Sequence, residues 1–371
     1  MSTFSTDHAC FNEVSTPALV LDVETLDRNI AAMAQTAANR GVALRPHAKT
    51  HKSVEIAKRQ LKNGANGIAC ATVSEIEYLA QSRIGNLLLT APVSSPEKAT
   101  RLARIAAASG SLSAVVDHEE QLPVLSDALL AYDASLAILI DTDVGQNRTG
   151  ITDLDRGVAL ARKVYETPGL ILKGIQGFAG QAQHIASEPE RKANAKAVQE
   201  HLQRFHQALQ AAGLPITCIS GSGTGTSLYD FAGPYTELQV GSYVFMDADY
   251  QSIDAPTASG LGFQTSLYVL ATVVSVNRPG QVTIDAGTKA LAFNGPSPKI
   301  ILGTPPGTSY RFAGDEHGIL HLADGALQPK LGSKVLLQAT HCDPTVNLFS
   351  QYHAVGEDGG LEIWPIGGRY V

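Results

Sequence analysis

Short apolar segments alternate with longer helical stretches from residue 16 to about residue 250 of this 371-residue chain. Strands that alternate with helices pair in parallel, because each helix carries the chain back to the edge where the previous strand began. The apolar segments lie at residues 18–22, 42–45, 67–71, 86–90, 113–117, 136–141, 172–178, 216–221 and 237–245. About eight strand–helix units favour a closed (β/α)8 TIM-type barrel, and an open, doubly wound sheet is the alternative.

The helical pattern ends after residue 255, and the rest of the chain is typical of strands separated by turns. Its strand-like segments are residues 267–276, 281–285, 310–312, 319–322, 334–339 and 361–366. Turn residues such as the Asn-Arg-Pro-Gly sequence at 277–280 divide them. The sequence therefore predicts an α/β chain with a barrel over residues 26–255 and an all-β C-terminal domain over residues 256–371.

The composition is typical of a soluble globular enzyme, with 44% hydrophobic and 17% charged residues. The net charge is −7 and no stretch is rich in lysine and arginine, so we expect no binding to nucleic acid or to anionic membranes. The N-terminus lacks a signal-peptide pattern, and the longest apolar run is shorter than the about 20 residues that span a bilayer. The four cysteines form no CxxC pair, which favours a cytoplasmic protein.

The densest group of reactive side chains is the basic sequence RPHAKTHK at residues 45–52, which follows the second apolar segment. Barrel enzymes place their catalytic groups at the C-terminal ends of the strands. Burial among cationic neighbours favours the neutral amine of a lysine, which is the form that makes a Schiff base. Lys49 is therefore a candidate catalytic residue, and a basic surface loop is the alternative interpretation.

A glycine-rich sequence, SGSGTGT at residues 220–226, follows a later apolar segment. Glycines allow backbone N–H groups to approach an anion closely, and the hydroxyl groups add further donors. It is not the dinucleotide-binding fingerprint, because residue 226 is threonine where the third glycine is required. Its place after a late barrel strand predicts a phosphate-binding loop that includes Gly223 and Thr224, and a plain surface loop is the alternative.

The sequence His341-Cys342-Asp343 follows the strand-like segment 334–339. In an extended chain, residues i and i+2 point to the same face, so His341 and Asp343 could bind one metal ion while Cys342 points away. An imidazole and a carboxylate suit divalent ions such as Mn²⁺ or Mg²⁺. The alternative is a pair of turn residues before Pro344.

Two further polar sequences follow predicted barrel strands. Residues 141–150, DTDVGQNRTG, leave one strand, so Arg148 is expected at the barrel mouth. His184 lies a few residues after the segment 172–178, which makes it a candidate acid or base. A lone histidine is otherwise more often structural.

Taken together, these motifs resemble the alanine-racemase-like enzymes that use pyridoxal 5′-phosphate (PLP), in the branch of D-threonine aldolase and D-serine dehydratase. The matching sequences run through nearly the whole chain in order. They are PHAKTHK at 46–52, DVG at 143–145 with Arg148 and Gly150, GIQ at 174–176, QH at 183–184, the 221–226 loop, YTELQ at 235–239, GSY at 241–243, FMD at 245–247, DY at 249–250, His341 and DPT at 343–345.

The resemblance implies that Lys49 binds PLP as a Schiff base and that Arg148 lies near the ring hydroxyl group. It also implies a homodimer and an N-terminal segment, residues 1–25, that packs with the β domain. The cofactor-binding residues it implies, besides Lys49 and Arg148, are Gly223, Thr224, Gly241, Ser242 and Tyr243.

The choice between aldolase and dehydratase depends on few residues. The dehydratases of this branch tend to carry His-x-Cys with zinc, whereas the D-threonine aldolases carry His-x-Asp and use manganese or a similar ion. His341 and Asp343 therefore favour the aldolase. Two departures affect substrate preference: Phe178-Ala179 stands where the aldolase pattern has Tyr-His, and Ala71 replaces a glutamine that contacts the cofactor in relatives.

We therefore predict a PLP- and metal-dependent lyase that cleaves D-threonine-like β-hydroxy-α-amino acids to glycine and an aldehyde. His184 would remove the β-hydroxyl proton, and the metal on His341 and Asp343 would bind that hydroxyl. In the alternative, a D-serine-type dehydratase, Lys49 would take the α-proton, and the products would be a 2-oxo acid and ammonia. A third reading is a PLP-binding regulatory protein, which would not need the metal pair.

Overall fold

The computed structural model describes residues 9–253 and 261–369, and the predicted domain boundary at residue 255 lies outside the described residues. Within this part the chain forms two compact units. One consists of residues 33–241 and 367–369, and the other of residues 9–32, 242–253 and 261–366. The following paragraphs describe each unit by itself.

The first unit is built on an eight-stranded parallel sheet with strand order β2-β9-β8-β7-β6-β5-β4-β3. Its strands are β2 (Ala43–Leu44), β3 (Ile68–Cys70), β4 (Leu87–Leu89), β5 (Leu112–Val116), β6 (Leu136–Asp141), β7 (Leu170–Gly177), β8 (Cys218–Gly221) and β9 (Glu237–Leu238). The two end strands meet, because the Asn66 N–H donates to Leu44 O and the Ala69 N–H donates to Pro46 O. This confirms the predicted barrel, and the open-sheet alternative is wrong.

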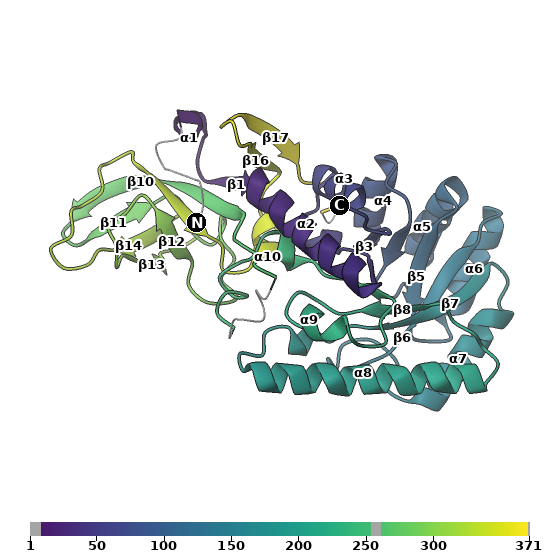
Figure 1. Ribbon diagram of the computed structural model, residues 1–371. Coiled ribbons are helices and arrows are strands. Elements are labelled where there is room, and N and C mark those ends of the chain that lie inside the picture. The colour runs from purple at the N-terminus through teal and green to yellow at the C-terminus, as the bar shows by residue number, and fades with distance from the viewer. Residues whose placement is uncertain (1–8, 254–260, 370–371) are drawn as a thin grey trace. The chain divides into compact units, whose positions relative to one another are not determined.

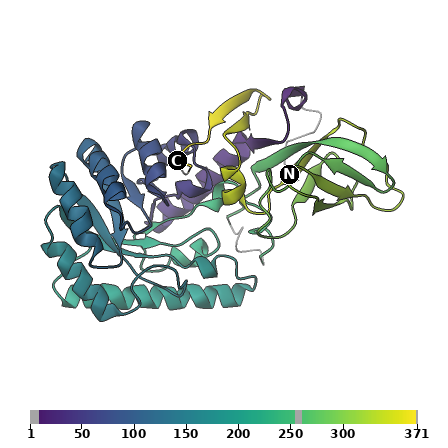
Figure 2. The same ribbon diagram turned by 180° about the vertical axis from the view of Figure 1, so that it is seen from behind.

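Helices connect the barrel strands and lie outside them, as Figures 1 and 2 show from opposite sides. They are α3 (Val54–Lys62), α4 (Val73–Gln81), α5 (Pro96–Ser109), α6 (Gln121–Ala131), α7 (Leu154–Glu166), α8 (Glu188–Ala211) and the short α9 (Ser227–Asp230), with α2 (Val23–Arg40) before them. Local sequence sets several of their starts. The Ser95 side chain caps α5 at 3.3 Å from the Lys98 N–H, and Gly110 ends that helix in the left-handed conformation.

The second unit contains a nine-stranded sheet whose main path is β13-β14-β11-β10-β1-β16-β17. The strands are β1 (Ala18–Asp22), β10 (Leu267–Arg278), β11 (Gln281–Ile284), β12 (Lys299–Leu302), β13 (Ser309–Phe312), β14 (Gly318–His321), β15 (Lys334–Gln338), β16 (Gln351–Val355) and β17 (Leu361–Pro365). Its helices are α1 (Ala9–Glu13) and α10 (Cys342–Asn347). The predicted all-β architecture of this half is confirmed.

Two local expectations were wrong, and two strands were not predicted. The alternation pattern groups the apolar segment 18–22 with the barrel strands, although the predicted barrel starts at residue 26; β1 pairs antiparallel with β10 and parallel with β16. The segment 237–245 is extended only over Glu237–Leu238 and turns into a 3-10 helix at Ser242–Val244. Strands β12 and β16 have short, mixed patterns and were not predicted. All of these depend on pairing partners far along the chain, which periodicity does not reveal.

No helix in the described ranges is long and apolar enough to cross a membrane. The core of the second unit joins both ends of its sequence, since Val20 of β1 packs with Leu270, Leu336 and Val355. Inside the barrel, Leu88, Val115, Leu139 and Cys218 form a buried cluster. The barrel interior is thus filled with side chains, which leaves the strand ends as the place for a site.

Candidate active site

Lys49 stands just after β2, in a single 3-10 turn that spans Ala48–Thr50. The turn begins at His47, whose Nδ1 accepts a hydrogen bond from the Lys49 backbone N–H at 3.3 Å. The Nε2 atom of the same ring is 3.1 Å from the hydroxyl of Thr90, which follows β4. The His47 ring therefore links two strand ends and fixes the turn that carries Lys49.

A cavity of about 310 Å³ lies at this end of the barrel, in the size range of small-molecule sites. Its described lining includes two cations, Lys49 and Arg148, and no carboxylate. The lining residues come from the ends of six strands and all belong to the barrel unit: His47, Lys49, Ala71, Thr90, Ala91, Arg148, Thr149, Gln176, Phe178 and Gln239. The cavity therefore suits an anionic ligand.

Phe178 lies close to both cations of the cavity. Its ring centroid is 5.7 Å from Lys49 Nζ and 5.9 Å from the guanidinium carbon of Arg148. Ammonium and guanidinium groups are attracted to an aromatic face at such distances. The structure thus brings Lys49 and Arg148, which lie about a hundred residues apart in the sequence, to the same aromatic ring.

The other cations of the basic sequence are neutralised. Arg45 is 1% exposed, and its Nε is 2.7 Å from Glu237 Oε1. Lys52 is also buried and forms an ion pair with Glu75. The surface-loop interpretation of residues 45–52 is therefore wrong, and so is the premise that these side chains act on Lys49 as bare positive charges.

The loop that carries Arg148 is held by aspartates at strand ends. Asp143 Oδ1 accepts hydrogen bonds from three successive backbone N–H groups, those of residues 145–147. Asp117, which follows β5, accepts the Gly150 N–H at 3.0 Å. Gly150 has φ +100°, and an added Cβ would lie 2.5 Å from the Asp143 nitrogen, so only glycine closes this loop.

Asp141, the last residue of β6, is buried behind the cavity wall. Its Oδ2 accepts the Thr149 hydroxyl and its Oδ1 accepts the Gln176 side-chain amide, each at 2.9 Å. Burial raises the pKa of this carboxyl to about 6, although both hydrogen bonds lower it. Asp141 therefore connects the Arg148 loop to the floor of the cavity.

Gln183 braces the glycine-rich loop after β8. Its Oε1 accepts the Gly225 N–H at 2.9 Å, and its Nε2 donates to the Thr226 hydroxyl at 3.0 Å. An added Cβ on Gly223 would lie 2.5 Å from Gln183 Oε1, and one on Gly225 would lie 2.1 Å from Gln183 O. The glycines are thus required for close packing against Gln183, a role that the sequence did not indicate.

Several buried hydrogen-bond donors in the barrel unit have no acceptor within the described protein. Within the described residues, the backbone N–H groups of Ser222 and Gly223 donate to no protein atom. The hydroxyl of Thr50 is likewise buried and without a partner there, and it lies 2.6 Å from where a Cβ on Gly241 would be. These residues follow β8, β9 and β2, which are neighbours in the sheet. Buried donors without partners are rare, and this group suits a phosphate.

The remaining predicted cofactor-binding residues lie in the same stretches of chain. Thr224 is 3% exposed within the glycine-rich loop. Ser242 and Tyr243 open the 3-10 turn Ser242–Val244 at the start of the second unit, and both are buried there.

His184 is the predicted acid or base, and it does not line the cavity. It is exposed after the 3-10 turn Gly180–Ala182 and is not among the residues that line the cavity. Its neighbour Gln183 is the buried member of the pair.

His341 and Asp343 lie in the second unit, where the expected extended geometry is wrong. Helix α10 begins at Cys342, so His341 is its capping residue and Asp343 is in its first turn. Cys342 is nevertheless fully buried, and its N–H donates to Asp247 Oδ2 at 2.8 Å, whereas His341 and Asp343 are half-buried. The His341 Nδ1 is 2.9 Å from the side-chain amide of Asn294.

His341 and Asp343 could offer a divalent ion one imidazole nitrogen and one carboxylate. In the described part of the chain, no group of three histidine, cysteine or carboxylate side chains is arranged to hold a metal. One imidazole and one carboxylate fit an ion that takes its other ligands from water and substrate. The contact of His341 with Asn294 is the kind of outer partner that orients a metal-binding imidazole.

Sequence reasoning did not single out two residues of the cavity wall. Gln176 and Gln239 are each 3% exposed and line the cavity. A signal was present, because Gln176 lies near the C-terminal end of β7 and Gln239 directly follows β9. Residues at that end of a barrel strand face the site.

Comparisons with known proteins agree with this geometry. Residues 21–249 match the family described as "Alanine racemase, N-terminal domain", and residues 266–355 match the "Putative serine dehydratase domain". The chain is 38% identical to a D-threonine aldolase of Arthrobacter sp over 96% of this chain and 93% of that protein. It is 35% identical to a 3-hydroxy-D-aspartate aldolase of Paracoccus denitrificans over 96% of this chain and 93% of that protein.

Among solved structures, the D-threonine aldolase of Filomicrobium marinum is similar with a TM-score of 0.92 and 37% identity. The match covers 96% of both chains. The similarity therefore extends over the barrel and the β sheet alike.

Proposed function

The chain belongs to the alanine racemase N-terminal domain family, and we propose that it is a PLP- and divalent-metal-dependent aldolase. Its proposed substrates are D-β-hydroxy-α-amino acids of the D-threonine type, which it cleaves to glycine and an aldehyde. The relatives described above are named as aldolases for such compounds, which supports a lyase of this kind. The enzyme class follows from the family, and the substrate is our inference.

The observation that carries the proposal is the pairing of a lysine cavity with a cradle for phosphate in one barrel unit. Lys49 and Arg148 line the cavity, and the buried donors of Ser222, Gly223 and Thr50 stand at neighbouring strand ends. A ligand with an aldehyde, an anionic ring oxygen and a phosphate has one partner for each of these groups. PLP is that ligand.

Each residue has a stated part in the proposed reaction. Lys49 would hold the cofactor covalently, and Arg148 would neutralise the charge of its ring oxygen. When bound, the cofactor supplies an electron sink for the pair of electrons left at Cα after the Cα–Cβ bond breaks. His184 takes the proton of the β-hydroxyl group, so that this oxygen becomes the carbonyl oxygen of the aldehyde.

We propose that His341 and Asp343 hold the divalent ion, Mn²⁺ or Mg²⁺ in preference to Zn²⁺. The support is their donor chemistry, together with the burial of Cys342, which leaves no thiolate toward solvent at this position. Such an ion lowers the pKa of a bound hydroxyl group.

The second candidate function is a dehydratase for D-serine-like substrates. It is favoured by one observation, the match of residues 266–355 to a putative serine dehydratase domain. In this reaction Lys49 would remove the α-proton, the β-hydroxyl would leave as water, and hydrolysis of the resulting enamine by water would give a 2-oxo acid and ammonia.

A homodimer and a cytoplasmic location complete the proposal. The homodimer rests on the resemblance described above, and the location rests on the cysteines. The thiols of Cys70, Cys218 and Cys342 are buried and unpaired, which is the usual state in a reducing compartment.

Product analysis with D-threonine tests the proposed function. Purified protein loaded with PLP and Mn²⁺ is expected to release glycine and acetaldehyde in equal amounts, because the Cα–Cβ bond is the one that breaks. Chromatography for glycine and an aldehyde assay measure both products. Release of 2-oxobutanoate and ammonia instead would establish the dehydratase, and turnover of L-threonine but not D-threonine would overturn the stereochemical proposal.

His184 is expected to matter for cleavage but not for loss of the α-proton. His184→Asn should slow retro-aldol cleavage by about 10²- to 10⁴-fold, the usual loss on removing a general base. Exchange of the α-proton of glycine, followed by NMR in deuterium oxide, should change much less, because glycine has no β-hydroxyl group. Equal loss in both reactions, with a lower melting temperature, would assign His184 a structural role. Unchanged cleavage would agree with its exposed position and remove it from the mechanism.

A further inference from the structure

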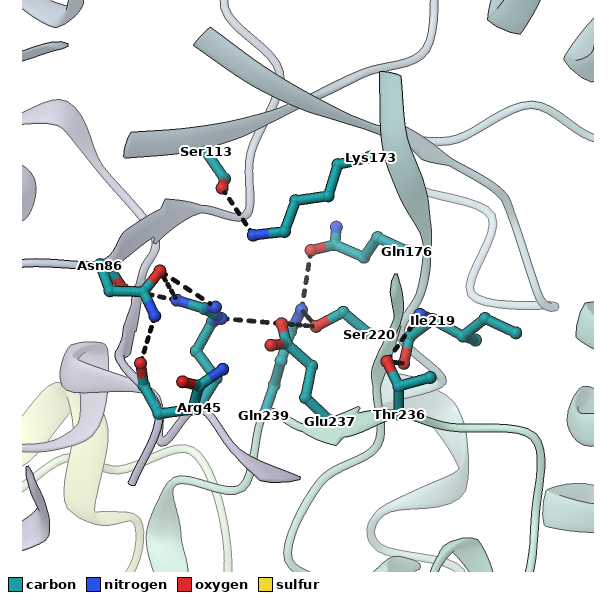
Figure 3. A network of polar contacts seen from close by, with 11 residues as sticks. Arg45, Asn86, Ser113, Lys173, Gln176, Ile219, Ser220, Thr236, Glu237 and Gln239 are labelled. Carbon is teal, nitrogen blue, oxygen red and sulfur yellow. Dashed lines mark hydrogen bonds and ion pairs between the residues drawn. The ribbon is translucent and has the colours of Figure 1, made fainter. Parts of the chain in front are cut away.

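Two glutamines on the cavity wall form the centre of a buried polar network (Figure 3). Gln176 donates both of its amide hydrogens, to Thr90 O at 3.0 Å and to Asp141 Oδ1 at 2.9 Å. Its Oε1 accepts a hydrogen bond from Gln239 Nε2 at 3.0 Å. Every polar group of the Gln176 side chain is therefore engaged, and its amide has a fixed orientation.

Gln239 also donates in a second direction. Its Nε2 is 2.9 Å from Ser220 Oγ, and that hydroxyl donates to Glu237 Oε1 at 2.7 Å. Glu237 in turn accepts the Arg45 Nε at 2.7 Å. Burial is the largest single effect on Glu237 and acts to raise its pKa, but the charge and hydrogen bond of Arg45, the Ser220 hydroxyl and the charge of Lys173 together lower it. Figure 3 shows this chain of contacts from Arg45 to Gln176.

The network permits only one orientation of the Gln239 amide. If this amide were reversed, its oxygen would face Gln176 Oε1, and Gln176 would have to reverse as well. A reversed Gln176 would then place its own oxygen against the carbonyl of Thr90, which cannot donate. The hydrogen bonds through Gln176 end at the Thr90 carbonyl, and those through Ser220 end at the Glu237 carboxylate, which is paired with Arg45. Both amide hydrogens of Gln239 are therefore donated to Gln176 and Ser220.

The remaining atom of this amide is Gln239 Oε1. Within the described residues this oxygen accepts no hydrogen bond, and the Gln239 side chain lines the cavity. A carbonyl oxygen in this position can only accept, so the cavity floor selects a ligand group that carries a hydrogen. Arg45 and Lys173, the basic side chains of the network in Figure 3, are directed to Glu237 and Ser113 instead.

We propose that Gln239 binds the protonated ring nitrogen of PLP, and that Ser220 and Gln176 are positioning residues that keep its oxygen toward the cofactor. This inference rests on the proposed function. The phosphate and the ring oxygen of PLP are acceptors and the aldehyde is consumed by Lys49, so the protonated nitrogen is the ring group that can donate to a carbonyl. A hydrogen bond to it keeps the ring cationic, which strengthens its withdrawal of electrons from Cα.

The test compares the binding of PLP with that of its 1-deaza analogue, in which a C–H replaces the ring nitrogen. Wild-type protein is expected to bind PLP roughly 10- to 100-fold more tightly than the analogue, the range for a hydrogen bond to a charged group. Gln239→Leu should bind the two ligands within about 3-fold of each other, because it removes the acceptor and keeps the volume. Dissociation constants come from fluorescence titration, with circular dichroism as the check on folding.

Ser220→Ala provides the second variant, since it leaves Gln239 and the Arg45–Glu237 ion pair in place. Without the Ser220 hydroxyl, the Gln239 amide should no longer be held in one orientation. The ratio of the dissociation constants for the analogue and for PLP should then lie between the ratios of wild type and Gln239→Leu. Equal binding of PLP and the analogue by wild type, or undiminished discrimination in either variant, would overturn the inference while PLP binding stands. Failure of wild type to bind PLP at all would overturn the proposed function as well.

Discussion

Replacing Lys49 with alanine is expected to abolish the visible absorbance of the lysine-bound cofactor and to reduce activity by roughly 10³-fold or more, the scale typical of losing a covalent catalytic group. Lys49 lines the cavity with Arg148 and sits on a turn fixed by His47. The fold should persist, because the backbone N–H of residue 49 can still donate to His47 Nδ1 and keep the turn in place. Absorbance spectra after addition of PLP, together with steady-state rates, measure both effects.

Reduction with borohydride followed by peptide mapping identifies the labelled lysine directly. Lys52→Arg is the matched control, because arginine keeps the ion pair with Glu75 but cannot form a Schiff base. This variant should retain both the label on residue 49 and the absorbance. A label on Lys52 or Lys173 in wild-type protein would show that the assignment of Lys49 is wrong.

The barrel could be predicted because its information is local. Each strand is a short apolar run and several helices have their own start signals, so the alternation of the two is visible along the sequence. The place of Ala18–Asp22 was not predictable in this way. This strand is as apolar as a barrel strand, and only its partners in β10 and β16, more than two hundred residues later, put it in the other sheet.

The candidate site shows the same division between local and distant information. The cluster around Lys49 was visible because reactive residues are adjacent in the sequence. Its electrostatics were not, since the carboxylates that neutralise Arg45 and Lys52 are Glu237 and Glu75. Gln176 and Gln239 were missed for a related reason. They are important because of hydrogen bonds to residues far away in the sequence, Thr90, Asp141 and Ser220, and the spacing of residues in the sequence does not reveal such contacts.

His341 and Asp343 illustrate how the choice of candidate residues can rest on a wrong local geometry. The alternation argument assumed that the strand continues to residue 343, but β15 ends at Gln338 and α10 starts at Cys342. A helix begins here because His341 is extended and Thr345 donates its hydroxyl to His341 O at 2.7 Å. Cys342 differs from His341 and Asp343 because it is fully buried whereas they are half-buried, and not because alternate residues of a strand point to opposite faces.

Loss of the proposed metal ligands is the other change from which a very large effect is expected. Asp343→Ala should remove bound metal and lower activity toward D-threonine by more than the roughly 10- to 100-fold that loss of an outer partner costs. PLP should stay bound, because its proposed contacts are all made by other residues. Metal content by mass spectrometry, cofactor absorbance and cleavage rate are measured on the same sample, and a chelator should reproduce the result in wild-type protein.

Two further variants locate the ion within this short sequence. Asn294→Ala removes the partner of His341 Nδ1 and should weaken metal binding by about 10- to 100-fold without abolishing it, as expected for an outer contact. Cys342→Ser should keep metal and activity, because residue 342 is fully buried and its N–H is held by Asp247. If metal were instead lost with Cys342 and kept without Asp343, the site would be a thiolate site. Because thiolates select softer ions such as Zn²⁺, that outcome would shift the proposal from aldolase to dehydratase.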